Sequence, residues 1–455
     1  MRTLILVGMV LAGSTGLTSV APLHAETLEE ALVSVYTSNP TLLAKRAELR
    51  ATDEGVSSAR SGYRPTVLFQ GDVGRINAEA KTQAGTDSDT FNPRSISLSA
   101  VQPLYTGGRT DAEIRAAERF VEAGRADLQV TEQRVMLNAV TAYLDVLRDQ
   151  SEVELNVNNE RVVAKQLEAA RNRFEVGEVT RTDVAQAEAR LAQARADRVA
   201  AEGNLVASRA IYREFIGDLP GQLMWPEPAP RLPQSENYAR ELAAKANPSI
   251  LLADFVERGT RDRIDVARST LMPKVQLRGD LSHGYDQSSV FERETAASIK
   301  AEVTVPLYQS GSEYAEVRRT KQVAAQRRHE LDVARRAVFD EVTQAWEGLM
   351  TAQARGAALA SQIEAVKAAL DGVQQEADVG LRTTLDVLDA EQELFAAQVY
   401  AVRARRDEYV AGFRVKSSVG ELTAELLGLP VERYDVTGYY ALVREKWFGS
   451  EIDGE

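Results

Sequence analysis

The chain has 455 residues, a formal net charge of −13 and no cysteine. An excess of acidic residues gives no electrostatic basis for nucleic-acid binding, which depends on Lys and Arg neutralising phosphates. The lack of cysteine excludes disulfides and lipid attachment to an N-terminal cysteine, so we do not expect a lipoprotein.

Residues 1–25 have the pattern of a secretory signal peptide. Arg2 precedes an apolar run from Leu4 to Leu11, and small residues lead to Ala25. Removing this segment deletes one Arg and no acid, so the formal charge of the mature chain becomes −14. No later segment approaches the roughly 20 consecutive apolar residues of a membrane helix. Any membrane-embedded part is therefore expected to consist of strands.

The remaining sequence is a tandem repeat, in which residues 28–217 recur at 236–420. Asn39 returns at Asn247, a shift of 208, and Gly177 returns at Gly380, a shift of 203. The second shift holds for more than about 100 residues, which indicates a duplicated architecture. We predict a signal peptide at 1–25, a first repeat at 26–220, a linker at 221–235, a second repeat at 236–421 and a C-terminal equatorial tail at 422–455.

Each repeat contains two stretches in which apolar and polar residues alternate, near 66–74 and 95–102 and near 274–282 and 297–305. This period predicts strands with one apolar face. Long polar loops are expected at 75–94 and 282–295, and prolines at the other ends should stop strand pairing. These features fit an outer-membrane barrel, although a soluble core with amphipathic hairpins remains open for either hairpin alone.

Four strands cannot close a barrel, because the smallest barrels need about eight. An open sheet edge in lipid would leave backbone groups unpaired. If the strands lie in a membrane, the barrel must be shared between chains.

Long helical hairpins are predicted at 109–216 and 312–419, since no Pro interrupts the chain after Gly108 or Gly311 until the next turn glycine. A run of some 67 residues spans about 100 Å as a helix. Its thin apolar seam has coiled-coil spacing, with Tyr143 and Trp346 as expected packing residues. Prolines between 226 and 233 exclude a helix there, and we expect this linker and the tail to lie around the middle of the helical body. The seam consists of Val135, Ala139, Ala142 and Val146, and of Val338, Val342, Ala345 and Leu349.

Paired motifs at equivalent repeat positions resemble the TolC family of outer-membrane efflux proteins over essentially the whole mature chain. They are Gln102-Pro103-Leu104-Tyr105 with Val305-Pro306-Leu307-Tyr308, and the turns Arg173-Phe174-Glu175-Val176-Gly177 and Val379-Gly380-Leu381-Arg382-Thr383-Thr384-Leu385-Asp386. The closing Lys446-Trp447-Phe448-Gly449 resembles the branch of type I secretion outer-membrane components.

The resemblance implies a mostly α fold with a small β part. It implies a homotrimer with a shared twelve-strand β-barrel in the outer membrane of a Gram-negative bacterium, continued by a helical tunnel through the periplasm. The implied partners are a periplasmic adaptor (membrane fusion) protein and an inner-membrane RND pump or ABC exporter. No cofactor is implied.

The family's functional residues map onto the helical tips. Asp386 and Asp389 correspond to the gate at the entrance, and Arg382, Thr182 and Asp183 to latches that hold it shut. A further latch residue, usually tyrosine, is Ala377 here, which implies a looser resting gate. The turns that meet the adaptor correspond to Val176, Gly177 and Glu178 and to Val379, Gly380 and Leu381.

A structural alternative exists for several of these residues. Thr180 with Asp183, and Thr383 with Asp386, fit the [ST]-x-x-[DE] pattern of a helix cap. The turn glycines fit a simple need for a positive φ angle. Capping and gating are compatible, so both interpretations stand.

No metal-ligand spacing, phosphate-binding loop or nucleophile elbow is present, so we do not expect an enzyme. A structural coiled-coil spacer or adhesin anchored in the outer membrane is the alternative, but its seam should be dense in Leu and Ile rather than Ala. The sequence favours a passive export duct, and drugs, toxins and secreted proteins are equally compatible cargoes.

Overall fold

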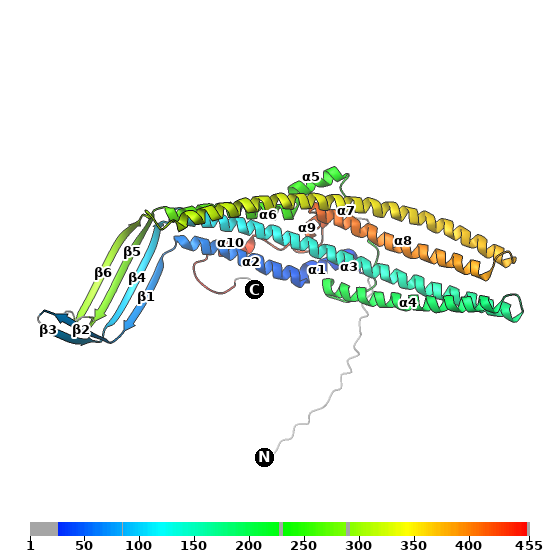
Figure 1. The fold of residues 1–455 in the computed structure, drawn as a ribbon, viewed down its shortest axis with the longest axis horizontal. Coiled ribbons are helices and arrows are strands. Elements are labelled where there is room, and N and C mark those ends of the chain that lie inside the picture. The colour runs from blue at the N-terminus through cyan, green and yellow to red at the C-terminus, as the bar shows by residue number, and fades with distance from the viewer. Residues whose placement is uncertain (1–25, 84, 227–230, 288–291, 453–455) are drawn as a thin grey trace, which may run out of the picture.

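The computed structural model describes residues 26–83, 85–226, 231–287 and 292–452. The predicted signal peptide, and residues 227–230 of the proline-rich linker, lie outside the described residues. The molecule is elongated, with a β-sheet at one end and two long helical hairpins that extend away from it (Figure 1). Across the described part of the chain, no helix is both long and apolar enough to cross a bilayer.

The two repeats have the same order of elements. The first contains α1 (Leu28–Ser38), α2 (Pro40–Arg60), β1 (Thr66–Val73), β4 (Arg94–Tyr105), α3 (Arg109–Glu175) and α4 (Arg181–Ile216). The second contains α5 (Glu236–Ala246), α6 (Pro248–Arg268), β5 (Lys274–Tyr285), β6 (Arg293–Thr304), α7 (Ser312–Asp378) and α8 (Thr384–Val419). Both α3 and α7 have 67 residues, and both α4 and α8 have 36, as the constant shift in the sequence requires. The expected mostly α architecture with a duplicated strand-strand-hairpin unit is confirmed.

The four main strands form one antiparallel sheet in the order β1-β4-β5-β6. Its register aligns Phe69, Leu98, Leu281 and Ala297 across the sheet, and Val67, Ala100, Gly279 and Ile299 in the next row of the same face. The opposite face carries Ser97, Ser99, Asp280 and Ser298. Because β1 and β6 pair on one side only in the described chain, the sheet has two free edges. We call the first of these faces the apolar face.

The sheet differs from the prediction in its first loop and at Pro103, and β5 and β6 both extend into the loop expected at 282–295. The first loop is not irregular but holds a separate hairpin of β2 (Ile76–Thr82) and β3 (Gly85–Phe91). Strand β4 also continues through Pro103, which we expected to stop pairing, and the register shifts between Pro103 and Tyr105. Proline has no backbone N–H to donate to the neighbouring strand, and a bulge at this position lets the strand continue past it.

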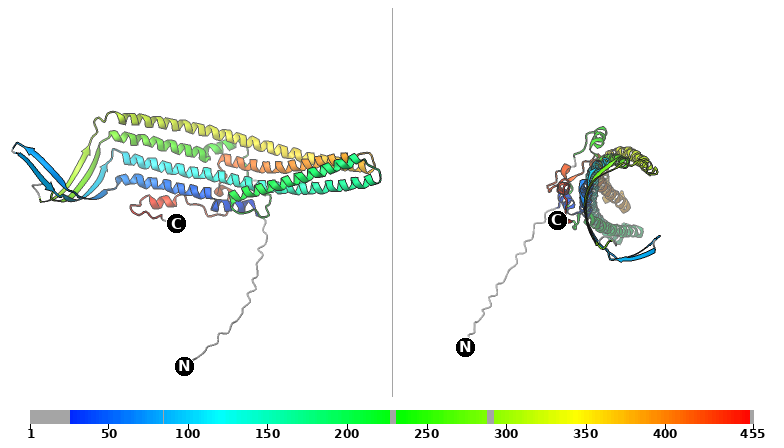
Figure 2. Two further views of the ribbon diagram at one scale, coloured as in Figure 1. Left: turned by 60° about the horizontal axis from the view of Figure 1, so that its bottom comes forward. Right: turned by 90° about the vertical axis from the view of Figure 1, so that its left-hand side faces the viewer.

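Four helices continue from the sheet as one curved layer, in the order α2, α3, α6 and α7 (Figure 2). Toward the far end α4 packs on α3, and α8 packs on α7. Helix α5 and the short helices α9 (Ala424–Leu427) and α10 (Gly438–Val443) lie on the convex side of the layer. The layer therefore has the form of a curved segment of a wall (Figure 2).

The main core lies midway along the helices, where α1 and the first linker meet α3. Tyr143 is fully buried, and its hydroxyl oxygen lies 2.8 Å from the carbonyl oxygen of Glu26 and 2.7 Å from that of Met224. Its predicted packing role is confirmed. Trp225 of the linker and Leu427 pack against the same cluster, so the linker and the start of the tail lie at the middle of the body, as expected.

One buried carboxyl gives a pH-dependent prediction. Asp53 of α2 is 1% exposed and its Oδ1 has no hydrogen-bond partner in the described chain. Burial raises the pKa of Asp53 to about 6, although the nearby Arg125 partly opposes this. The folded state therefore keeps a proton that the unfolded chain releases above about pH 4, so this group loses stability as the pH rises through about 4 to 6.

We therefore expect Asp53→Asn to stabilise the protein at pH 7.5 by about 2 kcal/mol, since two pKa units correspond to somewhat more than this. The gain should largely vanish at about pH 3, where Asp53 is protonated in both the folded and the unfolded chain. Thermal unfolding followed by circular dichroism at both pH values checks this. An equal gain at both would show that titration of Asp53 is not the cause.

Candidate functional site

The two helical hairpins end in matching turns at the far tip of the molecule. Gly177 and Gly380 have φ angles of 81° and 80°. A Cβ atom built at either glycine would have no neighbour within 4 Å, so the backbone angle alone explains glycine here. The structural interpretation of these glycines is confirmed.

The residues around each glycine are strongly exposed. Val176, Val379 and Leu381 are 71%, 72% and 76% exposed, and Glu178 lies beside Arg173 at the turn surface. Each turn therefore presents apolar side chains to solvent, at the end of the molecule farthest from the sheet.

The returning helices α4 and α8 begin with capping boxes. The Thr180 N–H donates to Asp183 Oδ2 at 2.7 Å, and the Asp183 N–H donates back to Thr180 Oγ1 at 3.3 Å. Thr383 and Asp386 repeat the arrangement at 2.9 Å and 3.3 Å. The backbone N–H bonds of Thr180 and Thr383 lower the pKa of Asp183 and Asp386, respectively. The capping interpretation is confirmed, and it keeps both carboxylates charged.

Asp389 has a different partner. Its Oδ1 accepts a charge-assisted hydrogen bond from Arg190 Nη2 of α4 at 2.7 Å, which joins the second hairpin to the first. Beside this ion pair, Leu388 is buried in a small apolar cluster with Ala187 and Leu191 of α4. Near the tip the two hairpins are therefore held together by this ion pair and by the apolar cluster around Leu388.

Arg190 was not found from the sequence. It lies 199 residues from Asp389, and its equivalent in the second repeat is Glu393, so neither spacing nor duplication points to the pair. No sequence signal could have identified it, because the contact depends on how one hairpin packs on the other.

The predicted latch residues are not joined within one chain. The Arg382 Nε donates to Glu376 Oε2 at 2.8 Å, while Asp183 is occupied by its cap. Thr182 is exposed, and Ala377 is buried without any hydrogen-bonding side chain.

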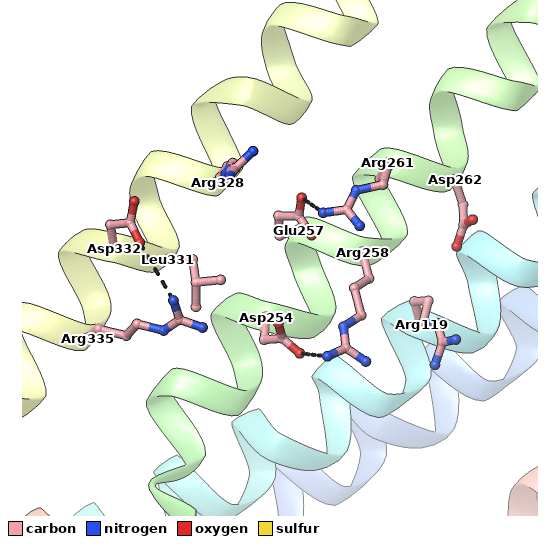
Figure 3. A pocket seen from close by; sticks show the side chains of 10 residues that line it. All are labelled: Arg119, Asp254, Glu257, Arg258, Arg261, Asp262, Arg328, Leu331, Asp332 and Arg335. Carbon is pink, nitrogen blue, oxygen red and sulfur yellow. Dashed lines mark hydrogen bonds and ion pairs between the residues drawn. The ribbon is translucent and has the colours of Figure 1, made fainter. Parts of the chain in front are cut away.

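A second group of charges lines a groove of ≈ 640 Å³ between α3, α6 and α7 (Figure 3). Arg258 pairs with Asp254 at 2.7 Å, Arg261 pairs with Glu257, and Arg335 lies 3.7 Å from Asp332. The groove is on the convex side, since its Arg119 also lines a smaller cavity with Tyr440 of α10. Most of its charges are neutralised by near neighbours on the same helix. Among the described residues no group of acids and histidines has the arrangement of a metal site.

Known proteins are similar to this chain over both repeats. The family model described as outer membrane efflux protein matches residues 31–217 and 239–421. Outer membrane efflux protein BepC of Brucella suis biovar 1 is 37% identical over 445 residues, which is 97% of this chain and 95% of that protein. Outer membrane protein TolC of Vibrio cholerae is 27% identical over 410 residues, 88% of this chain and 92% of that protein.

Among solved structures, the outer-membrane channel OprN has a TM-score of 0.74 at 21% identity, covering 86% of this chain and 89% of that one. At this identity the likeness concerns the fold. The resemblance drawn from the paired motifs is thus confirmed by sequence and by structure. This chain belongs to the outer membrane efflux protein family, the TolC family of channels.

Proposed function

We propose that this protein is the outer-membrane exit duct of a tripartite efflux or type I secretion system. It works as a passive homotrimer that crosses the outer membrane and the periplasm. Energy for export comes from an inner-membrane RND pump or ABC exporter, coupled through a periplasmic adaptor.

The observation that carries this proposal is the sheet. Its apolar face is exposed, with Val67 at 63%, Phe69 at 67% and Ile299 at 82%. Both of its edges are free in the described chain. Backbone groups in lipid must be paired, so β6 of one copy is expected to pair with β1 of the next. Three copies of four strands give a closed barrel of twelve, within the range known for membrane barrels.

The helices support the same assembly. The layer of α2, α3, α6 and α7 is curved in the same sense as the sheet (Figure 2), so three copies would form a continuous wall around a central tunnel. Helix α3, with 67 residues, is about 100 Å long, several times the thickness of a bilayer core. A duct of this length reaches far into the periplasm.

At the tip we propose that Asp386 and Asp389 form the gate and that Arg190 belongs to it. The exposed turns at Val176–Glu178 and Val379–Leu381 are the proposed adaptor contacts. Arg382 would act as a latch toward Thr182 or Asp183 of a neighbouring copy, which its bond to Glu376 must first release.

Single-channel recording in planar bilayers tests the proposal. A purified duct should give discrete conductance steps that persist without any energy source. A coiled-coil spacer or adhesin would insert without discrete steps, and that result would reject the proposal.

A further inference from the structure

Residues 438–448 of the C-terminal tail form an arm that lies along α2. Tyr439 of α10 donates from its hydroxyl to Glu54 Oε1 at 2.8 Å, and Ser57 Oγ lies 3.4 Å from the carbonyl oxygen of Lys446. One turn further, Arg60 forms an ion pair with Glu445. The arm contacts Glu54 through Tyr439 and Arg60 through Glu445, so it runs toward the sheet (Figure 1).

The arm ends at the start of the first strand. Arg64 donates from Nη1 to the Lys446 carbonyl oxygen at 2.8 Å, and its guanidinium carbon lies 4.9 Å from the centre of the Trp447 ring. Only Pro65 separates Arg64 from β1, so Arg64 lies within about 7 Å of the strand along the backbone. The tail was expected at the middle of the helical body, but Lys446 and Trp447 lie next to Arg64, close to the start of β1.

At this point the arm exposes two large aromatic side chains. Trp447 is 56% exposed and Phe448 is 86% exposed, and their ring centres are 6.4 Å apart. The arm fixes its backbone through hydrogen bonds and ion pairs while leaving its largest apolar groups uncovered. That arrangement does not serve the stability of a single chain, so the rings require a partner outside it.

The position of the two rings along the long axis of the molecule, beside the helix-side ends of the strands, indicates the partner. A strand of twelve residues such as β5 rises about 40 Å, or about 30 Å along the membrane normal when tilted as barrel strands are. The apolar band of such barrels is about 25 Å tall and has aromatic girdles at both interfaces. The helix-side ends of the strands therefore lie at an interface, and the exposed Tyr105 at the end of β4 marks the same level.

We propose that Trp447 and Phe448 form an anchor that inserts into the periplasmic leaflet of the outer membrane, with phospholipid as its partner. Indole rings favour the membrane interface, where the apolar body meets acyl chains and the N–H meets water. Arg60 and Arg64 lie beneath the rings at the level of the phosphate groups, which cations attract. The arm lies on the convex side of the helical layer, the side that faces outward when copies close into a ring. This inference rests on the proposed membrane insertion of the sheet.

The natural chain contains no cysteine, so single-cysteine variants need no background mutations. We would attach a nitroxide spin label to Phe448→Cys, to Phe69→Cys on the apolar face and to Leu442→Cys on α10. Leu442 is 59% exposed in the same arm but farther from the sheet, which makes it the aqueous control. Each variant is reconstituted in phosphatidylcholine vesicles, and collision rates with oxygen and with a water-soluble nickel chelate are measured.

The anchor predicts an interfacial label at Phe448, with nickel collisions reduced at least about twofold relative to Leu442 and oxygen collisions increased, since oxygen concentrates in acyl chains. A label at Phe448 as accessible to nickel as at Leu442 would overturn the proposal. A label shielded from both reagents would also overturn it, because that result means packing against a second copy. If the label at Phe69 is not exposed to lipid, both the proposed function and the anchor are rejected. If the label at Phe69 is exposed to lipid but the label at Phe448 is not, only the anchor is rejected.

Discussion

The Asp386→Asn, Asp389→Asn double variant is expected to lose most of the divalent-cation block of the channel in planar bilayers. Three copies would bring six carboxylates to the axis, and the three Arg190 side chains offset half of them. The ring therefore carries a net charge of about −3 in the parent and about +3 in the variant. A positively charged ring repels cations.

The size of the effect follows from Coulomb energies. Two unit charges 4 Å apart interact by about 1 kcal/mol in water and about 4 kcal/mol at a protein surface. A divalent ion carries twice that charge and loses its contact with the carboxylates in the variant, so block should weaken by more than about tenfold. The measurement is the concentration of divalent cation that halves the single-channel current.

Arg190→Gln is the matched control at the same site. It releases Asp389 from its ion pair and raises the net negative charge of the ring, so block should become stronger rather than weaker. Opposite shifts in the two variants would assign the block to this ring of charges. Unchanged block in both would remove Asp386 and Asp389 from the entrance.

The Ile299→Arg variant is expected to fail to assemble in the outer membrane. Ile299 lies near the middle of β6 on the apolar face and is 82% exposed. An Arg at the bilayer midplane costs about 2–4 kcal/mol, so a trimer would lose about 6–12 kcal/mol. The amount of protein in purified outer membranes, measured by immunoblotting against the parent, checks this.

Ser298→Arg is the matched control, because it places the same side chain one residue away on the opposite face of the sheet. Successive residues of a strand point to opposite sides, so this Arg should face the water-filled interior and assembly should persist. If both variants assembled equally well, the apolar face would not contact lipid.

Sequence patterns predicted the fold where they were periodic. The shift of 203 residues gave α3 and α7 equal lengths, and the alternation near 274–282 predicted which residues of β5 share a face. The alternation of apolar and polar residues specifies the face on which each side chain lies, but it does not specify where a strand ends. Strands β4, β5 and β6 are therefore longer than predicted, and the hairpin of β2 and β3 was missed.

The candidate site could be predicted only in part for a similar reason. Local interactions such as the cap of Asp386 by Thr383 are visible in a four-residue pattern. The Arg190 and Asp389 pair depends on the packing of one hairpin against the other, and the contact of Trp447 with Arg64 joins residues from opposite ends of the chain. Neither contact leaves a periodic signal.

The central claim is that three copies close their sheets into one barrel. Native mass spectrometry of the protein extracted from outer membranes in mild detergent tests it most directly. The account predicts a single dominant species with three times the mass of the mature chain. A monomer that remains in solution without detergent would contradict it.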